Sequence, residues 1–332
     1  MKKGYLIFTV FILSSLFAAC ANMGETATED TATENTNEAA TPTVYAVTSS
    51  GLGISTDGGA SFTNKTTAEG LGLNFIFSVY VSGSTIYAGT GNGLSISTDG
   101  GASFINKTMD DGLDSNWIQE VHVSGSTIYL GMDTGLSIST DNGVSFVHKD
   151  IFDGLADNDV HALYVSGTTI YVGTGFGVSI STDGGTSFTN KTIADGLGSD
   201  WVEAVYVSGS VLYVATTMGL SISTDGGTSF TNKTTADGLG HNWVSDVYVS
   251  GSTIYAGTKN GLSISTDGGT SFTNITSGLN DAYILSVFVS SSTIYAGNPR
   301  GLNISTDGGA SFTSKTTADG LGEDIVKQLF VQ

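Results

Sequence analysis

The chain has 332 residues, of which 46 are glycine and only two are proline. Ser, Thr, Val, Ile and Tyr are abundant, which favours short strands joined by tight turns and predicts an all-β protein. Acidic residues outnumber basic residues by 31 to 11, and the formal net charge is -20. Because phosphate backbones are bound by clustered Lys and Arg, we expect no nucleic-acid partner.

Residues 1–19 are predicted to be an export signal. Lys2 and Lys3 precede an apolar stretch that is too short to cross a membrane comfortably. Residues 16–20, Leu-Phe-Ala-Ala-Cys, resemble a bacterial lipobox, in which the cysteine receives a diacylglycerol and signal peptidase cuts before it. The resemblance implies a lipidated Cys20. The alternative is an ordinary signal peptide with an incidental cysteine.

Residues 20–42 are predicted to be a disordered tether. They are dominated by Thr, Glu, Ala and Asn and show no apolar periodicity. With Cys20 lipidated, the resemblance implies a cell-envelope lipoprotein that contacts the membrane only through its lipid anchor. In a Gram-negative host the outer membrane is the expected location, because the aspartate that retains such proteins at the inner membrane of enteric bacteria is missing after Cys20.

One sequence unit is repeated seven times from residue 43 onwards. The string Gly-x-x-Ile-Ser-Thr-Asp recurs with a spacing of 42 residues, and of 40 residues in the last copy, and its aspartates are Asp57, Asp99, Asp141, Asp183, Asp225, Asp267 and Asp307. Within one unit, four short runs predict strands A to D at residues 201–207, 211–215, 220–223 and 229–232.

A unit of this length with four antiparallel strands has the size of one propeller blade. An open β-solenoid is the alternative. The first copy begins with strand B at residues 43–47, and the chain finishes with strand A at residues 325–331, so the two ends complete one blade. We therefore predict a seven-bladed β-propeller over residues 43–332, built from four-stranded antiparallel blades and closed by the C-terminal strand.

Residues 55–62, Ser-Thr-Asp-Gly-Gly-Ala-Ser-Phe, and their six repeats resemble the Asp-box of bacterial neuraminidase repeats. The run Gly-Leu-x-x-Asn-x-Ile/Val before strand A also resembles repeats in the propeller regions of two-component regulators. The Asp-box resemblance implies that the seven aspartates are structural and remote from any ligand. Calcium is the alternative, but it needs six or more oxygens whereas each turn offers one carboxylate. We predict no metal and no cofactor.

The neuraminidase resemblance makes an enzyme the competing hypothesis. Neuraminidases hold the sialic acid carboxylate with three arginines, whereas this chain contains only Arg300. The four histidines have no metal-ligand spacing, and no nucleophile elbow is present. We predict no catalysis. The alternative is a glycan-acting hydrolase or lyase that uses paired acids, because Glu120, Glu203 and Asp246 lie on A strands, which line a propeller's channel.

Comparison of the seven copies locates a candidate binding rim. The second, fifth, sixth and seventh positions of strand A are almost all apolar or aromatic and are predicted to be core, including His122 at the sixth position. The first and third positions and the B–C loops vary, and in a propeller they share one face. The predicted rim consists of Phe75, Trp117, Asp159, Trp201, Trp243, Tyr283, Gln119, His161, Glu203, Lys327 and Arg300.

The predicted function is partner binding by a monomer. The rim aromatics would stack on sugar rings or peptide side chains of a protein or glycan partner, while Asn116, Asp200 and Asn242 beside them would form hydrogen bonds with it. Two alternatives remain: the tryptophans plug gaps between adjacent blades, or the rim varies by drift after duplication.

Overall fold

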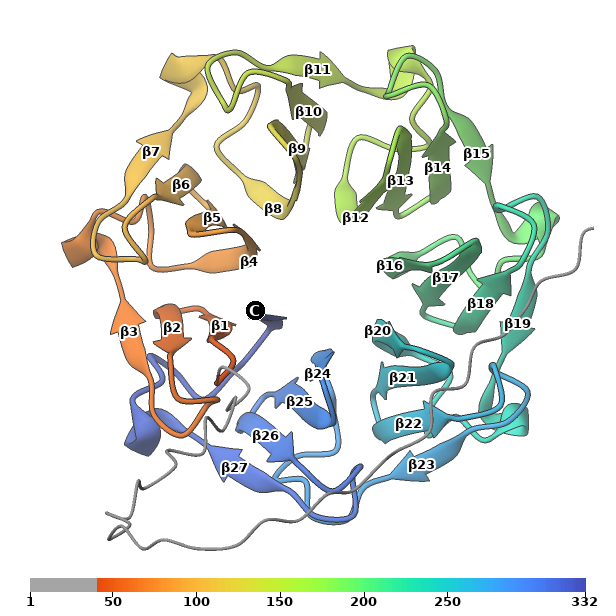
Figure 1. Ribbon diagram of the computed structural model, residues 1–332. Helices are drawn as coiled ribbons and strands as arrows, with labels where there is room; N and C mark the ends of the chain where they lie inside the picture. The colour runs from red at the N-terminus through yellow and green to blue at the C-terminus, as the bar shows by residue number, and fades with distance from the viewer. Residues whose placement is uncertain (1–40) are drawn as a thin grey trace, which may run out of the picture. The chain divides into compact units, whose positions relative to one another are not determined.

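The computed structural model describes residues 41–332. The predicted signal peptide, Cys20 and almost all of the predicted tether lie outside the described residues. Residues 41–332 form seven four-stranded antiparallel sheets arranged in a ring, which confirms the predicted all-β seven-bladed propeller (Figure 1). In this part of the chain no helix is long and apolar enough to span a membrane.

Each blade runs from strand A at the central channel to strand D at the circumference (Figure 1). The A strands are β4 Ile76–Ser82, β8 Ile118–Ser124, β12 Val160–Ser166, β16 Val202–Ser208, β20 Val244–Ser250, β24 Ser286–Ser290 and β28 Gln328–Val331. The B strands are β1 Val44–Thr48, β5 Thr85–Thr90, β9 Thr127–Met132, β13 Thr169–Thr174, β17 Val211–Thr216, β21 Thr253–Thr258 and β25 Thr293–Asn298.

The outer strands are shorter. The C strands are β2 Gly51–Ser55, β6 Gly93–Ser97, β10 Gly135–Ser139, β14 Gly177–Ser181, β18 Gly219–Ser223, β22 Gly261–Ser265 and β26 Gly301–Ser305. The D strands are β3 Thr63–Lys65, β7 Ile105–Lys107, β11 Val147–Lys149, β15 Thr189–Lys191, β19 Thr231–Lys233, β23 Thr273–Ile275 and β27 Thr313–Lys315. Short 3-10 helices follow six D strands: η1 Thr67–Glu69, η2 Met109–Asp111, η3 Ile151–Asp153, η4 Ile193–Asp195, η5 Thr235–Asp237 and η6 Thr317–Asp319.

The two ends of the described chain close the ring, as predicted. The C-terminal strand β28 pairs antiparallel with β1, with Val44 opposite Val331 and Tyr45 opposite Phe330. The backbone of Thr43 also exchanges hydrogen bonds with Gln332 at 2.9 and 3.0 Å. The last blade to be completed therefore consists of the first three strands of the propeller and its final strand.

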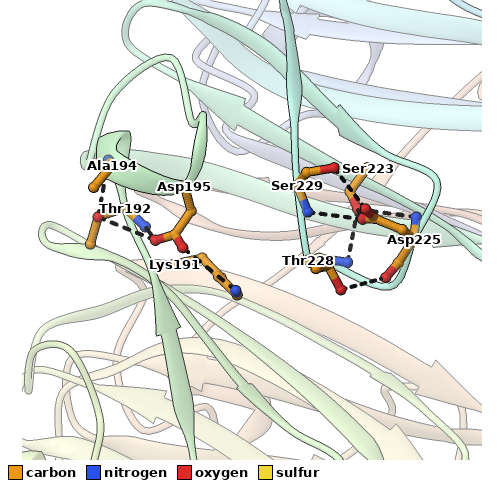
Figure 2. Close-up of polar contacts among 9 residues, drawn as sticks. Lys191, Thr192, Ala194, Asp195, Ser223, Asp225, Thr228 and Ser229 are labelled. Carbon is orange, nitrogen blue, oxygen red and sulfur yellow. Dashed lines mark hydrogen bonds and ion pairs between the residues drawn. The ribbon is translucent and has the colours of Figure 1, made fainter.

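The C–D turns, which we call the aspartate turns, have one hydrogen-bond pattern in all seven copies. In the turn of Asp225, Oδ1 accepts from the Ser223 hydroxyl at 2.7 Å and the Ser229 backbone N–H at 2.9 Å, while Oδ2 accepts from the Ser229 hydroxyl at 2.6 Å (Figure 2). Bonds from Ser229 and Ser223 lower the pKa of Asp225 to about 2. Because Ser229 serves the turn, strand D begins at Thr231 rather than at residue 229 as predicted.

The aspartate turn also satisfies a buried backbone group. The Ser223 hydroxyl accepts a hydrogen bond of 2.8 Å from the N–H of Gly227, and both residues are buried. Gly226 and Gly227 have φ angles of 71° and 87°, a conformation that residues with a Cβ adopt at a cost. The turn therefore favours glycine at both positions, and the one exception, Asn142 in the third copy, also has a positive φ of 59°.

The turn between strands D and A is also capped by side chains. Asp195 accepts from the Thr192 backbone at 3.0 Å, and Lys191 lies 3.6 Å from its carboxylate (Figure 2). Asp200 accepts a hydrogen bond of 2.7 Å from the Ile193 N–H, and Asn116 and Asn242 accept the equivalent bonds in their units. These three side chains hold the turn at the start of the 3-10 segment, and their predicted hydrogen bonds to a partner stay a prediction.

A β-bulge near the start of strand A sets which side chains face the channel. We number strand A from its first predicted residue, so that Trp201 is position 1. In β16, Val202 pairs with Thr216 and Ala204 pairs with Ala215, which leaves Glu203 as the extra residue. The same shift occurs in β4, β8, β12 and β20.

Positions 3, 4 and 6 of strand A therefore face the channel, while positions 2, 5 and 7 are buried in the blades. Position 6, including His122, was predicted to belong to the core. For this reason it faces the channel, while six of its seven side chains also pack against the hydrophobic cores of the blades.

Candidate binding site in the central channel

The central channel contains a cavity of about 660 Å³, lined by residues of all seven A strands. This volume is within the range of small-molecule and side-chain binding sites. Three tiers of side chains surround it. The wall tier at position 3 consists of Phe77, Gln119, His161, Glu203, Ser245, Leu285 and Lys327. The acid tier at position 4 consists of Ser78, Glu120, Ala162, Ala204, Asp246, Ser286 and Gln328, of which all but Ser78 and Ala162 line the cavity. The aromatic tier at position 6 consists of Tyr80, His122, Tyr164, Tyr206, Tyr248, Phe288 and Phe330.

Five of the predicted rim residues line this cavity. Gln119, His161, Glu203 and Lys327 belong to the wall tier, and Trp201 reaches the cavity from position 1. The other six do not line it. Phe75, Trp117, Asp159, Trp243 and Tyr283 surround the entrance as neighbours of the wall tier or of one another, and Arg300 is separate from both groups.

On one side of the entrance the aromatic side chains form a cluster. The ring of Phe77 lies 4.8 Å from that of Phe75 and 4.6 Å from that of Trp117, measured between centroids. The ammonium group of Lys327 lies 3.6 Å from the Phe75 centroid. Trp117 remains 43% exposed. The cluster is therefore a partly exposed apolar surface beside the channel.

Next to it, a polar group connects two blades. Asp159 accepts a hydrogen bond from the Gln119 amide and lies 3.0 Å from Nε2 of His161. The His161 ring stacks at 4.7 Å against Trp201, which is 46% exposed. Trp201 thus packs against His161 while about half of its surface faces solvent, so it is not fully buried between the blades.

The remaining predicted rim residues are Trp243 and Tyr283, which contact a lysine, and Arg300, which pairs with an aspartate. The ammonium group of Lys259 lies 3.1 Å from the Trp243 ring centroid and 5.6 Å from that of Tyr283. Arg300 lies 3.3 Å from the carboxylate of Asp281, and its side chain is 72% exposed. Arg300 belongs to the same face but contributes nothing to the cavity.

Glu120 is one of the two acids of the acid tier. Its carboxylate accepts a hydrogen bond of 2.9 Å from the Ser78 hydroxyl and bonds of 3.1 and 3.2 Å from the Gln328 amide. Burial nevertheless raises the pKa of Glu120 to about 8, against the opposing effect of these bonds. At neutral pH the side chain is therefore mostly protonated.

Asp246 lies in the same tier, three blades away from Glu120. Its two oxygens accept hydrogen bonds of 2.8 Å each from the backbone N–H groups of Val247 and Val287. Burial raises the pKa of Asp246. Glu203, one tier nearer the entrance, also has a raised pKa because of burial, opposed by His161 and by Trp201. The cavity thus contains three carboxyl groups that resist ionisation.

The acid tier also joins neighbouring blades. The Ser78 hydroxyl accepts a 3.1 Å bond from the Val121 N–H, and Gln328 accepts one of 2.7 Å from the Val79 N–H. Ser286 receives the same kind of bond from Leu329 at 3.2 Å. In each case a position 4 side chain accepts from position 5 of the next blade. No local sequence pattern predicts this arrangement, because the partners are more than 40 residues apart.

The aromatic tier forms an unbroken ring deep in the channel. Successive ring centroids are between 4.5 and 5.8 Å apart all the way round. Burial lowers the pKa of His122 to about 4, so this histidine is neutral at pH 7. An aromatic residue at position 6 in every copy is visible in the sequence, but only the bulge shows that it faces the channel.

No protein-family model matches the chain, and no curated protein matches it. Among solved structures, the chain is similar to the extracellular domain of a protein described as a hybrid two-component system from B. thetaiotaomicron, with 19% identity and a TM-score of 0.68. The match covers 80% of this chain and 38% of the other, so the chain spans about two fifths of that domain.

Two further structures resemble the chain. YCF48 bound to a D1 peptide is 14% identical with a TM-score of 0.59, covering 86% of this chain and 88% of the other. An ancestral GH74 enzyme is 17% identical with a TM-score of 0.52, covering 82% of this chain and 52% of the other. At these identities the similarity shows the propeller fold alone, because propellers carry many unrelated functions.

Proposed function

We propose that the protein is an exported, membrane-anchored binding protein without catalytic activity, whose central channel receives part of a protein or glycan partner. The cavity of about 660 Å³ is the observation that carries this proposal. It combines partly exposed aromatic rings at its entrance with polar and acidic side chains inside, which is the composition expected of a ligand site. The three carboxyl groups with raised pKa values support a functional rather than a structural role for the channel.

Variation among the copies also supports binding on this face. The wall tier contains seven different residues in seven blades, although the neighbouring position 2 is always Ile or Val. A repeated unit whose channel-facing wall position differs in every copy builds an asymmetric site from symmetric parts.

The binding proposal is tested with the full chain in a non-ionic detergent. The immobilised protein is exposed to a glycan array and to detergent-solubilised envelope extract. We expect a glycan or protein to bind the wild type and to be lost from the double variant Trp201→Ala/Glu203→Gln. The matched control is Val144→Thr on an aspartate turn, where Val144 is exposed and lies on the opposite face. If the wild type, the double variant and the Val144→Thr control all retained the glycan or protein equally, binding through the channel would be contradicted.

The proposed anchor is Cys20, and the proposed location is the cell envelope, at the outer membrane in a Gram-negative host. The lipobox-like run supports the anchor, and the similarity to extracellular domains agrees with export. Cys20→Ser is expected to abolish labelling by a fatty acid and to release the protein from membrane pellets, because the thiol is the only site for the lipid. A variant that still labels would refute the anchor. This test of the lipid anchor does not depend on whether the aspartate turns are Asp-boxes of the neuraminidase-repeat type.

A glycan-acting enzyme is the second candidate. Glu120, with a pKa of about 8, is a carboxyl group that could donate a proton, and Asp246 lies in the same tier. Against catalysis, both oxygens of Asp246 accept backbone hydrogen bonds and hold two blades together. Release of reducing sugar from an array glycan by the wild type, abolished in Glu120→Gln, would establish the enzyme instead.

A further inference from the structure

We propose that the channel cavity binds an organic cation, the guanidinium or ammonium group of a basic side chain in a peptide partner, between Glu120 and Asp246. This inference rests on the proposed binding function and names the chemistry of its ligand. It starts from the geometry of the cavity, in which two carboxyl groups of the acid tier are enclosed between the wall tier and the aromatic tier.

The two carboxyl groups have no cationic partner in the described part of the chain. Glu120 contacts the hydroxyl of Ser78 and the amide of Gln328, and both are neutral. Asp246 accepts hydrogen bonds from two backbone N–H groups and interacts with the neutral hydroxyl of Ser286. Buried carboxylates in proteins are normally paired with a positive group, so the channel offers two acids to a cation from outside.

The positive groups near the cavity are directed elsewhere. Lys327 lies over the Phe75 ring and interacts with Glu323. His161 is bound to Asp159, and burial keeps the pKa of His122 at about 4. The titratable side chains that line the cavity are Glu120, Glu203, Asp246, His122, His161, Lys327, Tyr80, Tyr164, Tyr206 and Tyr248. None of the basic ones forms an ion pair with Glu120 or Asp246.

The aromatic tier supplies a second, independent feature. Seven rings surround the channel next to the acid tier, and aromatic rings attract guanidinium and ammonium groups, most strongly where water is excluded. The Ser245 hydroxyl in the wall tier also lines the cavity and is a further acceptor. A guanidinium group has five N–H donors and no acceptor, which matches a site made of acceptors and rings.

A neutral sugar would use the same rings and hydroxyl acceptors but would gain nothing from the negative charge that the two acids can take up beside a cation. The protein as a whole carries a formal net charge of -20, which draws cations toward it and repels anions. The observations therefore favour a basic peptide side chain over a neutral glycan.

The test uses the full chain in a non-ionic detergent and isothermal titration calorimetry. The probes are Nα-acetyl-arginine N-methylamide and its citrulline analogue, which has nearly the same shape and no charge. We expect the arginine compound to bind at least about 10-fold more tightly, as for hydrogen bonds that involve a charged group. Equal affinities for the two compounds, or binding of cellobiose with neither of them bound, would overturn the proposal.

Proton release gives a second readout. At pH 7 Glu120, with a pKa of about 8, is mostly protonated, and a bound cation favours its ionised form. Binding should therefore release protons, which titrations in two buffers of different ionisation enthalpy detect. Affinity for the arginine compound should increase between pH 6 and pH 9, because the guanidinium charge stays constant. A ligand that accepts a hydrogen bond from protonated Glu120 would show the opposite trend and refute the cation.

Variants complete the design. Glu120→Gln should weaken binding of the arginine compound by about 10- to 100-fold and abolish the proton release. Asp246→Asn should weaken binding of the arginine compound similarly, and thermal melting checks that this variant folds. It replaces Glu120→Gln in the test if that variant does not fold. The control Asp110→Asn removes the same charge from an exposed residue outside the cavity and should change neither readout. Unchanged binding in both cavity variants would refute the site.

The two proposals fail separately. If the wild type captures a partner through the channel but binds neither the arginine compound nor a basic peptide, the cation proposal is wrong and the proposed function stands. If channel variants change neither partner capture nor cation binding, both are wrong.

Discussion

The aspartate-turn face and the channel face of the propeller are built from the same seven copies but differ in how far the copies agree. Each aspartate turn has the same Ser–Asp–Ser hydrogen bonds, as in the turns of Asp57 and Asp225. The wall tier, on the opposite side of the blades, contains a different residue in each blade. The residues of the aspartate turn are therefore required in every blade, whereas each wall-tier residue occurs in only one blade of the ring.

The physical basis of the contrast is where the hydrogen bonds lead. In an aspartate turn the side chain forms hydrogen bonds with backbone groups of its own hairpin. Loss of that side chain should therefore lower the stability of any copy by the same amount. In the channel the seven side chains share one space, and a charged or aromatic group is required only in the blades that face a given part of the ligand. Uniform positions therefore indicate folding, and variable positions that face a cavity indicate recognition.

Removal of residues 325–332 should have the largest effect. It removes Val326, Leu329 and Val331 from the core, and burial of these three side chains is worth roughly 5 to 9 kcal/mol before the entropy of ordering is subtracted. This is as large as the whole stability of many domains. We expect the protein to unfold or aggregate, as measured by circular dichroism melting. Removal of residues 21–40 is the control and should leave the melting temperature nearly unchanged. A truncated protein that melts cooperatively near the parent temperature would argue against a closed ring.

Ser223→Ala should break one aspartate turn and lower stability less. The substitution leaves the buried Gly227 N–H without its acceptor, which costs about 1 to 3 kcal/mol. Thr224→Ala changes an exposed neighbour, and its free energy of unfolding should stay within about 0.5 kcal/mol of the parent value. Urea denaturation measures both. A similar loss in the two variants would show that the turn contributes no more than the surface around it.

Glu120→Gln should change the pH dependence of stability. The folded pKa of Glu120 is about 8 and its ordinary value is 4.5, so its favourable contribution is complete below about pH 4.5 and is lost as the pH rises through 8. The aspartate turns behave in the opposite way, because a pKa near 2 for Asp225 means that its contribution is lost only as the pH falls from about 4 through 2. Between pH 5 and pH 9 the wild type should therefore lose stability, and the variant should lose less. Parallel melting curves for the two proteins across this range would contradict the burial of Glu120.

Trp201→Ala should have the smallest effect on stability while abolishing partner binding. Trp201 is 46% exposed, so truncation should cost clearly less than the roughly 3 to 5 kcal/mol of a buried tryptophan. The fluorescence of the wild type should include a solvent-exposed component from Trp201 and Trp117 that acrylamide quenches. Blue-shifted emission that is protected in all three tryptophans would show that they plug the gaps between blades.

The sequence alone determined the number of blades, the strand-exchange closure and the face on which the copies vary. These features are periodic or local: the spacing of Asp57, Asp99 and their equivalents counts the blades, and residues 43–47 and 325–331 are each recognisable as half of one unit. The D–A and B–C loops share a face because of strand order, which the repeat pattern already contains. Five residues of the predicted rim, Gln119, His161, Glu203, Lys327 and Trp201, line the cavity, and their role in partner binding stays a prediction.

Only the tertiary structure decided which side chains meet in the channel. The bulge beside Glu203 changes the alternation of strand A, so that position 6 turns from the blade to the channel, and no residue type in the strand marks the shift. The contact of Glu120 with Gln328, 208 residues away, depends on closing the ring. Burial of Glu120 and Asp246 likewise arises only when seven blades enclose one space. Local patterns therefore predict a repeated fold well, whereas a site at the axis depends on distances that no single repeat contains.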